Sequence, residues 1–138
     1  MFKTVKDRVW AFDAEWIPDP AAGKLLYDLP DNTPDLDVVK RMWKEGGATE
    51  EDPTPYLKTV VCRIVSVAAV DRFESGRKAK LHLLSLPRDL EDPEQVSEKS
   101  IVGTFLDKVG QYKPQLVGFN SASADLKAFI QRAVVLGI

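Results

Sequence analysis

The chain has 138 residues, which suits one domain and excludes two well-cored ones. Hydrophobic residues make up 44% and charged residues 29%, a balance that excludes a chain disordered by composition. Nineteen basic and 21 acidic residues give a formal charge of -2, which excludes nucleic-acid binding through charge alone. We therefore expect a single domain over residues 1–138.

The composition also indicates a location. No window approaches the ~20 apolar residues of a membrane span, and the charged N-terminal stretch does not resemble a signal peptide. The single cysteine, Cys62, cannot form an internal disulfide, which fits a reducing compartment. We expect a cytoplasmic chain without a membrane partner.

Residues 8–16 are rich in apolar and aromatic side chains and precede Pro18, so they predict a first strand. Side chains alternate along a strand, which places Asp13 and Glu15 on one face with Val9 and Ala11. Because the rest of the strand is apolar, we expect this acidic pair to lie on a buried face.

Residues 17–58 differ in composition, with six of the nine prolines, and predict a Pro-rich insertion in the domain. Within it, residues 35–45 predict a helix with acids at its start and Gly46 at its end. The expected apolar stripe of that helix is Leu36, Val39, Met42 and Trp43.

The remaining residues predict two strands and then alternating helices and strands. Residues 59–73 and 80–86 predict an antiparallel hairpin, residues 93–112 a helix, and residues 115–119 a short buried strand. A last helix should begin near Ser121 or Ser123, with one of these serines as its N-cap. Its apolar positions are Leu126, Phe129, Ile130, Ala133 and Val134.

This order predicts an α/β fold: a mixed sheet of three mostly antiparallel strands followed by β-α units, with helices packed on it.

The acidic pair has a chemical consequence. Two carboxylates on one buried face repel each other, so one must be protonated or a cation must lie between them. Oxygen ligands without a Cys/His cluster favour Mg²⁺ or Mn²⁺ over zinc. The alternative is that Asp13 and Glu15 lie at a solvated strand end and bind nothing.

Asn120 and Asp125 follow the short strand 115–119. If that strand lies beside residues 8–16, Asp125 reaches the sheet edge that carries Asp13 and Glu15. Alternatively, Asp125 complements the helix dipole and Asn120 makes a turn.

Two segments together resemble a known superfamily. Val9-Trp-Ala-Phe-Asp-Ala-Glu15 is similar to the first motif, and Leu116-Val-Gly-Phe-Asn-Ser-Ala-Ser-Ala-Asp-Leu126 to the second motif, of the DEDD 3'-5' exonucleases. The resemblance is nearest to predicted exonucleases related to the proofreading domain of family B DNA polymerases. Ala124 replaces the aromatic residue common before the second motif's aspartate. The resemblance implies a ribonuclease H-like fold.

The resemblance also implies a two-metal 3'-5' exonuclease. Asp13, Glu15 and Asp125 would be catalytic and would hold two Mg²⁺ or Mn²⁺ ions, with Asp13 bridging them. Asn120 would position the substrate, and Trp16 is a candidate for stacking on a base, with core packing as its alternative. Single-stranded DNA is the expected partner, and RNA the alternative.

The family's third motif supplies a Tyr or His and a fourth aspartate, but no Asp, Glu, Tyr or His follows Asp125. We therefore expect an N-terminal portion of the family domain that lacks its last strand and helix. Such a fragment should be weakly active or inactive, and should self-associate through its uncovered edge.

Two other functions compete with this one. The chain could be a non-catalytic ribonuclease H-like module that binds nucleic acid or protein. Haloacid dehalogenase-type phosphatases also place an acidic pair after a strand, but their pattern is Asp-x-Asp, whereas Glu15 is the second acid here. The predicted hairpin also fits their parallel sheet poorly.

Overall fold

The computed structural model describes residues 6–76 and 78–138. The chain divides into two compact units: Met1–Glu15 with Ile64–Ile138, and Trp16–Arg63. The second unit covers nearly the same residues as the expected insertion at 17–58. Among the described residues, none of the helices combines the length and apolar character needed to cross a membrane.

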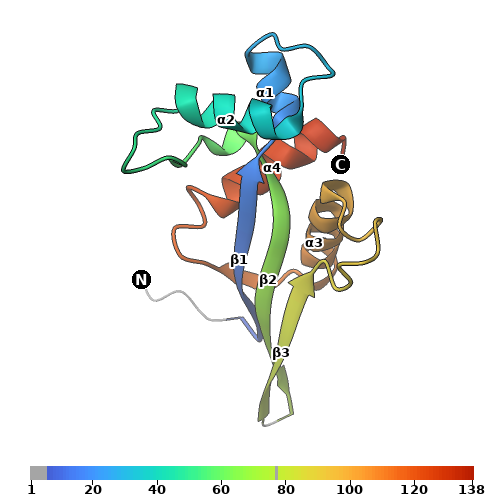
Figure 1. The fold of residues 1–138 in the computed structure, drawn as a ribbon. Helices are drawn as coiled ribbons and strands as arrows, with labels where there is room; N and C mark the ends of the chain where they lie inside the picture. Colours follow the sequence, from blue (N-terminus) through green and yellow to red (C-terminus); the bar gives the residue numbers. More distant parts are fainter. Residues whose placement is uncertain (1–5, 77) are drawn as a thin grey trace. The chain divides into compact units, whose positions relative to one another are not determined.

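The first unit is built on a four-stranded mixed sheet with the order β3-β2-β1-β4 (Figure 1). The pairing of β2 and β3 is antiparallel, from Val67 opposite Leu86 to Ser75 opposite Lys78, which confirms the predicted hairpin. β1 pairs with β4 in parallel. The strands are β1 (Arg8–Pro18), β2 (Cys62–Ser75), β3 (Lys78–Leu86) and β4 (Gln115–Val117).

The side chains of β1 alternate as the sequence predicts. Trp10, Phe12 and Ala14 are buried. Asp13 and Glu15 point to the other side and are exposed, so the expectation that their face is buried is wrong. We call the side of the sheet that carries Asp13 and Glu15 the open face.

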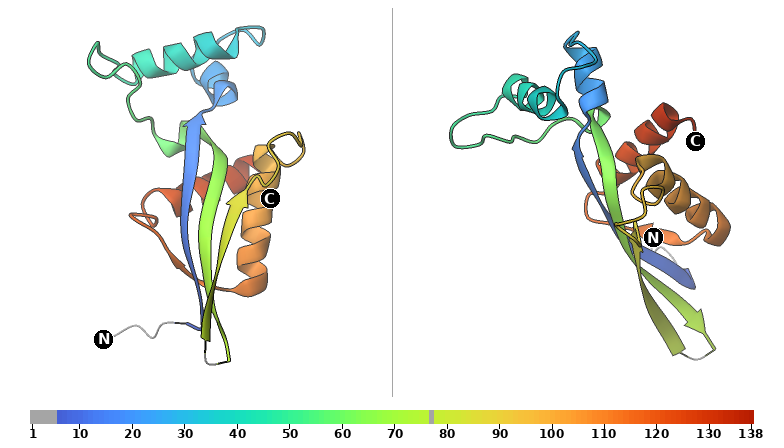
Figure 2. Two further views of the ribbon diagram at one scale, coloured as in Figure 1. Left: turned by 60° about the horizontal axis from the view of Figure 1, so that its bottom comes forward. Right: turned by 45° about the vertical axis from the view of Figure 1, so that its right-hand side comes forward.

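Helices α3 (Glu98–Tyr112) and α4 (Asp125–Leu136) cover the opposite side of the sheet (Figure 2). The rings of Phe105 and Phe129 stack with centroids 4.4 Å apart, and the ring of Phe12 lies 5.4 Å from that of Phe105. Trp10 completes this aromatic cluster. The core of the first unit therefore lies between β1 and the two helices.

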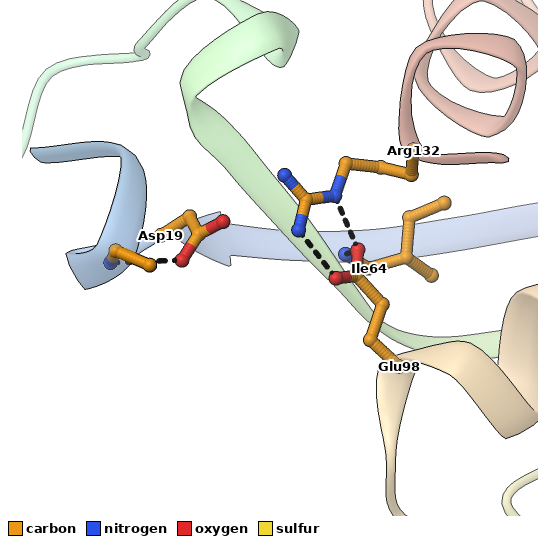
Figure 3. A network of polar contacts seen from close by, with 5 residues as sticks. Asp19, Ile64, Glu98 and Arg132 are labelled. Carbon is orange, nitrogen blue, oxygen red and sulfur yellow. Dashed lines mark hydrogen bonds and ion pairs between the residues drawn. The ribbon is translucent and has the colours of Figure 1, made fainter. Parts of the chain in front are cut away.

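An ion pair joins the two helices to β2 (Figure 3). The Glu98 carboxylate accepts hydrogen bonds from Nε and Nη2 of Arg132, at 2.7 and 2.6 Å. It also accepts the backbone N–H of Ile64, at 2.7 Å. Three elements that are distant in sequence thus meet at one carboxylate.

The starts of both helices differ from the sequence prediction. α3 begins at Glu98 rather than at 93, and the Ser97 hydroxyl caps it. α4 begins at Asp125 without a side-chain cap, so the predicted capping by Ser121 or Ser123 is wrong. Residues 121–124 instead form turns directly before the helix.

The apolar pattern of α4 is also only partly buried. Phe129 lies in the core, but Ile130 and Val134 are 66% and 77% exposed. Two polar side chains, Asp125 and Arg132, take buried positions in their place. Their hydrogen bonds to β1 and to α3 compensate for that burial.

The second unit contains α1 (Pro20–Leu26), α2 (Asp35–Glu45) and the 3-10 helix η1 (Thr59–Val61). α2 confirms the predicted helix, but it buries Val38 and Met42, while Leu36 is exposed. The sequence analysis did not predict α1, although Asp19 as N-cap followed by proline is a typical helix start.

Candidate functional site

The first acid of the β1 pair, Asp13, borders a hollow on the open face. Asp13 lines this hollow together with Val70 of β2, Leu83 of β3, and Val117 and Phe119 around the end of β4. Phe119 is 96% exposed and Leu83 is 80% exposed. A carboxylate therefore stands beside an accessible apolar and aromatic surface.

Asp125 reaches the same strand from α4. Its Oδ1 accepts the backbone N–H of Ala14 at 3.2 Å, and the side chain is buried. β4 ends at Val117, opposite Ala11, so the β1 edge beyond Ala11 is not paired with β4. The Asp125 carboxylate thus supplies an acceptor where the β4 ladder stops.

The loop between β4 and α4 is closely fitted to β1. A Cβ on Gly118 would lie 2.7 Å from Cβ of Ser121 and 3.1 Å from the carbonyl oxygen of Phe12, so only glycine fits. Asn120 follows with a φ of 52°, a left-handed conformation that asparagine tolerates. Its side chain is exposed, while its carbonyl accepts the N–H of Ser123.

Two of the predicted ligands thus lie on β1 and the third contacts that strand from α4, but the three carboxylates do not converge. β4 lies beside β1, as the site prediction required, and Asp125 is anchored between Asp13 and Glu15. Nevertheless, no three His, Cys, Asp or Glu side chains in the described ranges 6–76 and 78–138 lie close enough to hold a metal ion. The assignment of these three residues as metal ligands therefore stays a prediction.

Trp16 belongs to the second unit. It is half-buried, and its ring meets that of Tyr56 edge-on with centroids 6.5 Å apart. This contact fits the packing alternative, and the role of Trp16 in substrate binding stays a prediction.

Phe119 is the residue that sequence reasoning missed. It lies inside the second motif, directly before Asn120, where it reads as the end of a buried strand. The strand instead ends at Val117, and the ring is left in solvent. The signal available in the sequence was Gly118, which interrupts the apolar run two residues before Asn120.

Residues 54–138 match the model of a family described as a predicted 3'-5' exonuclease related to the exonuclease domain of PolB. The match includes Asn120 and Asp125 and leaves out the segment with Asp13 and Glu15. No curated protein and no solved structure matches the chain significantly. Because the family model covers more than half of the chain, this protein belongs to the family of predicted 3'-5' exonucleases related to the exonuclease domain of PolB.

Proposed function

We propose that this chain binds the 3' end of single-stranded nucleic acid, with DNA as the expected polymer, and contributes to hydrolysis of the terminal phosphodiester bond. One observation carries the proposal: Asp125, within the family match, is hydrogen-bonded to the strand segment that carries Asp13 and Glu15. The sheet order β3-β2-β1-β4 is compatible with a ribonuclease H-like fold, which we propose for the first unit.

The open face offers a place for the terminal nucleotide. The exposed ring of Phe119 provides a surface on which a base can stack, a contact that every base can make. Val117 and Leu83 extend that surface as apolar contacts. A base on Phe119 brings its phosphate toward the side of the hollow where Asp13 lies.

The negative charge of the two β1 acids opposes the binding of a phosphodiester on this face. Asp13 and Glu15 are acidic and exposed, so they repel a phosphodiester unless a cation lies between them. Carboxylate oxygens suit Mg²⁺ or Mn²⁺, but as placed the three carboxylates do not form a set that fits two ions. We therefore derive no hydrolytic step through a metal, and metal dependence remains a prediction of the family resemblance.

The lack of a converging set of carboxylates among the described residues also favours a second candidate function. A nucleic-acid-binding module needs the aromatic surface at Phe119 but no converging carboxylates. Within the described ranges, the lack of such a cluster is what this alternative expects. Binding without cleavage separates the two functions.

The test uses the 138-residue chain and a 5'-labelled single-stranded oligonucleotide, as DNA and as RNA, with Mg²⁺, Mn²⁺ or a chelator. We expect slow shortening from the 3' end in the presence of metal and none with the chelator. Asp13→Asn should abolish shortening. Asp107→Asn, which removes an exposed acid of α3, is the matched control and should behave as the wild type.

Binding is measured in parallel by fluorescence anisotropy. A wild-type chain that binds the oligonucleotide but leaves it intact in Mn²⁺ supports the binding module. Equal shortening by wild type and Asp13→Asn contradicts the site assignment. A chain that neither binds nor shortens either polymer contradicts both functions.

A further inference from the structure

β3 forms one edge of the sheet in the first unit, so one side of its backbone faces no strand among the described residues. The other side pairs with β2 along the whole strand, from Leu86 opposite Val67 to Lys78 opposite Ser75. The outer ends of β2 and β3 extend beyond α3 and α4 in both views of Figure 2. The N–H and C=O groups on the free side of β3 can therefore form a ladder with another extended chain.

The other edge of the same sheet offers a much shorter ladder. β4 has three residues, Gln115–Val117, whereas β3 has nine, Lys78–Leu86. An added strand gains main-chain hydrogen bonds in proportion to the length that it pairs. If two copies of the chain associate through a sheet edge, β3 therefore supports the stronger contact.

The side chains of β3 leave an apolar pair in solvent. Leu81 and Leu83 point to the open face, where Leu83 lines the hollow beside Asp13, and they are 67% and 80% exposed. Lys80 and His82 point to the other side and are also exposed. Neighbouring exposed leucines on a free edge strand are typical of a surface that another chain covers.

The charges of β3 are confined to one half of the strand. Lys78 and Lys80 lie in the first half, and the residues from Leu83 to Leu86 carry no charge. A second copy aligned in parallel would place each lysine opposite its own copy, and like charges directly opposite are destabilising. An antiparallel copy instead places the lysine half of each strand opposite the leucine half of the other. The charge pattern therefore favours an antiparallel pair.

The antiparallel register centred on His82 also matches the apolar side chains. It places Leu81 opposite Leu83 of the second copy, so that four leucines form one cluster across the two open faces. It places Lys80 opposite Leu84 of the second copy, and the aliphatic stem of the lysine can cover that leucine while its ammonium stays in water.

The neighbouring registers are less favourable. A pair centred on Leu81 would set Lys80 against His82. A pair centred two residues later would set Lys78 against Arg88, which are both cations. A shift by a single residue would set open-face side chains against those of the other side of the sheet. Charge and face therefore both favour the register centred on His82.

We propose that β3 joins two copies of this chain into a two-fold symmetric dimer, with the strands antiparallel and His82 opposite His82 of the second copy. Two four-stranded sheets become one continuous sheet, and both open faces lie on the same side. One strand edge is smaller than the interface of a stable dimer, so we expect a weak association with a Kd of about 0.1 mM. The dimer needs neither metal nor nucleic acid and does not rest on the proposed function.

Sedimentation velocity of the 138-residue chain from about 10 μM to 1 mM measures the association. Leu83→Lys should raise the Kd at least about tenfold, because it brings a charge into the leucine cluster. Ile130→Lys puts the same charge on an exposed apolar position of α4 and should leave the Kd unchanged. Asp13→Asn should associate as the wild type, which separates this result from a failure of the proposed hydrolysis.

A mixture of two variants tests the register. Leu81→Glu should weaken the dimer as Leu83→Lys does. When these two variants are mixed, the register sets the new carboxylate opposite the new ammonium, and a mixed dimer should form. A mixture of Leu81→Lys with Leu83→Lys sets two cations opposite each other and should stay monomeric.

Cross-linking tests the register without disturbing the leucines. Residues directly opposite in an antiparallel pair have Cα atoms about 4.5–5.5 Å apart, which suits a disulfide. In a Cys62→Ala background with oxidised glutathione, His82→Cys should therefore form a covalent dimer. Ser85→Cys is the matched control, because its two copies would lie about 20 Å apart along the strands.

Three results would overturn the proposal. The first is a wild-type chain that stays monomeric at 1 mM. The second is a dimer that Ile130→Lys weakens as much as Leu83→Lys does, which would place the interface outside β3. The third is cross-linking through Ser85→Cys as readily as through His82→Cys, since the strands would then not pair around His82.

Discussion

The carboxylate of Asp125 accepts the backbone N–H of Ala14, at a distance of 3.2 Å, across 111 residues of sequence. This bond fixes the first turn of α4 against β1 at the residue between the two exposed acids. One side chain therefore has both a structural role and a proposed functional one, and substitutions can separate the two.

Replacing Asp125 tests that separation. Asp125→Ala leaves a buried N–H without its acceptor and should lower the free energy of unfolding by about 1–3 kcal/mol, measured by urea denaturation. Asp125→Asn keeps an acceptor oxygen and should stay within about 1 kcal/mol of the wild type. If Asp125→Asn nevertheless loses metal-dependent shortening of the oligonucleotide, the charge of Asp125 acts in the site.

Two results would contradict this division of roles. Equal destabilisation by Asp125→Ala and Asp125→Asn would show that the hydrogen bond is not what Asp125 contributes. Full activity in a folded Asp125→Asn variant would remove this residue from the proposed site.

Gly118→Ala should be destabilising because its Cβ would lie 2.7 Å from Cβ of Ser121. Overpacking of this kind costs typically about 1–3 kcal/mol, measurable as a lower midpoint of thermal unfolding. Gly110→Ala is the matched control, since nothing lies within 4 Å of a Cβ on Gly110 in α3. That variant should gain up to about 1 kcal/mol from helix propensity. Equal effects of the two substitutions would contradict the close approach of the loop to β1.

Arg132→Met should destabilise the first unit strongly. The Arg132 and Glu98 side chains are only 6% and 10% exposed, so removing the arginine leaves a nearly buried carboxylate without its counter-ion. Breaking such a pair costs about 3–5 kcal/mol in the free energy of unfolding. Arg41→Met breaks an exposed pair with Glu45 and should cost less than about 1 kcal/mol.

A double variant checks the origin of that loss. Glu98→Gln with Arg132→Met removes both charges but keeps an acceptor for the Ile64 N–H. We expect it to recover a large part of the stability that Arg132→Met loses. A double variant no more stable than Arg132→Met alone would show that packing, not the unpaired charge, causes the loss.

Elements with a strong local pattern were predictable from the sequence. Residues 35–45 carry helical periodicity between an acidic start and a glycine stop, and α2 has the same bounds. The hairpin of β2 and β3 follows from a β-branched run in residues 59–73 and a leucine-rich segment in residues 80–86, on either side of Ser75-Gly76. In these segments local preference and tertiary packing agree.

Other elements depended on contacts that no local pattern records. The first turn of α4 is set by the bond between Asp125 and Ala14, so the nearby serines do not cap it. Arg132 takes a buried position because Glu98, 34 residues earlier in the chain, compensates its charge. Ile130, which fits the apolar periodicity, is consequently exposed.

The candidate site, too, was predictable from the sequence only in part. Alternation along β1 placed Asp13 and Glu15 on one face, and the parallel pairing of β4 brought Asp125 to that strand. Whether a face is buried depends on what covers it, and periodicity alone does not report that. The exposure of Phe119 beside Asp13 likewise could not be predicted from the sequence, because it follows from the end of β4 at Val117.

Phe119 carries the last prediction. Because its ring is 96% exposed, Phe119→Ala should leave the free energy of unfolding within about 0.5 kcal/mol of the wild type. The loss of one stacked base should weaken binding of a single-stranded oligonucleotide by about 1–3 kcal/mol, measured by anisotropy. Phe119→Tyr retains a ring and should bind as the wild type. Leu90→Ala, which trims another exposed apolar side chain away from the open face, should have no effect on affinity. Unchanged affinity in Phe119→Ala would mean that the 3' end is not held beside Asp13.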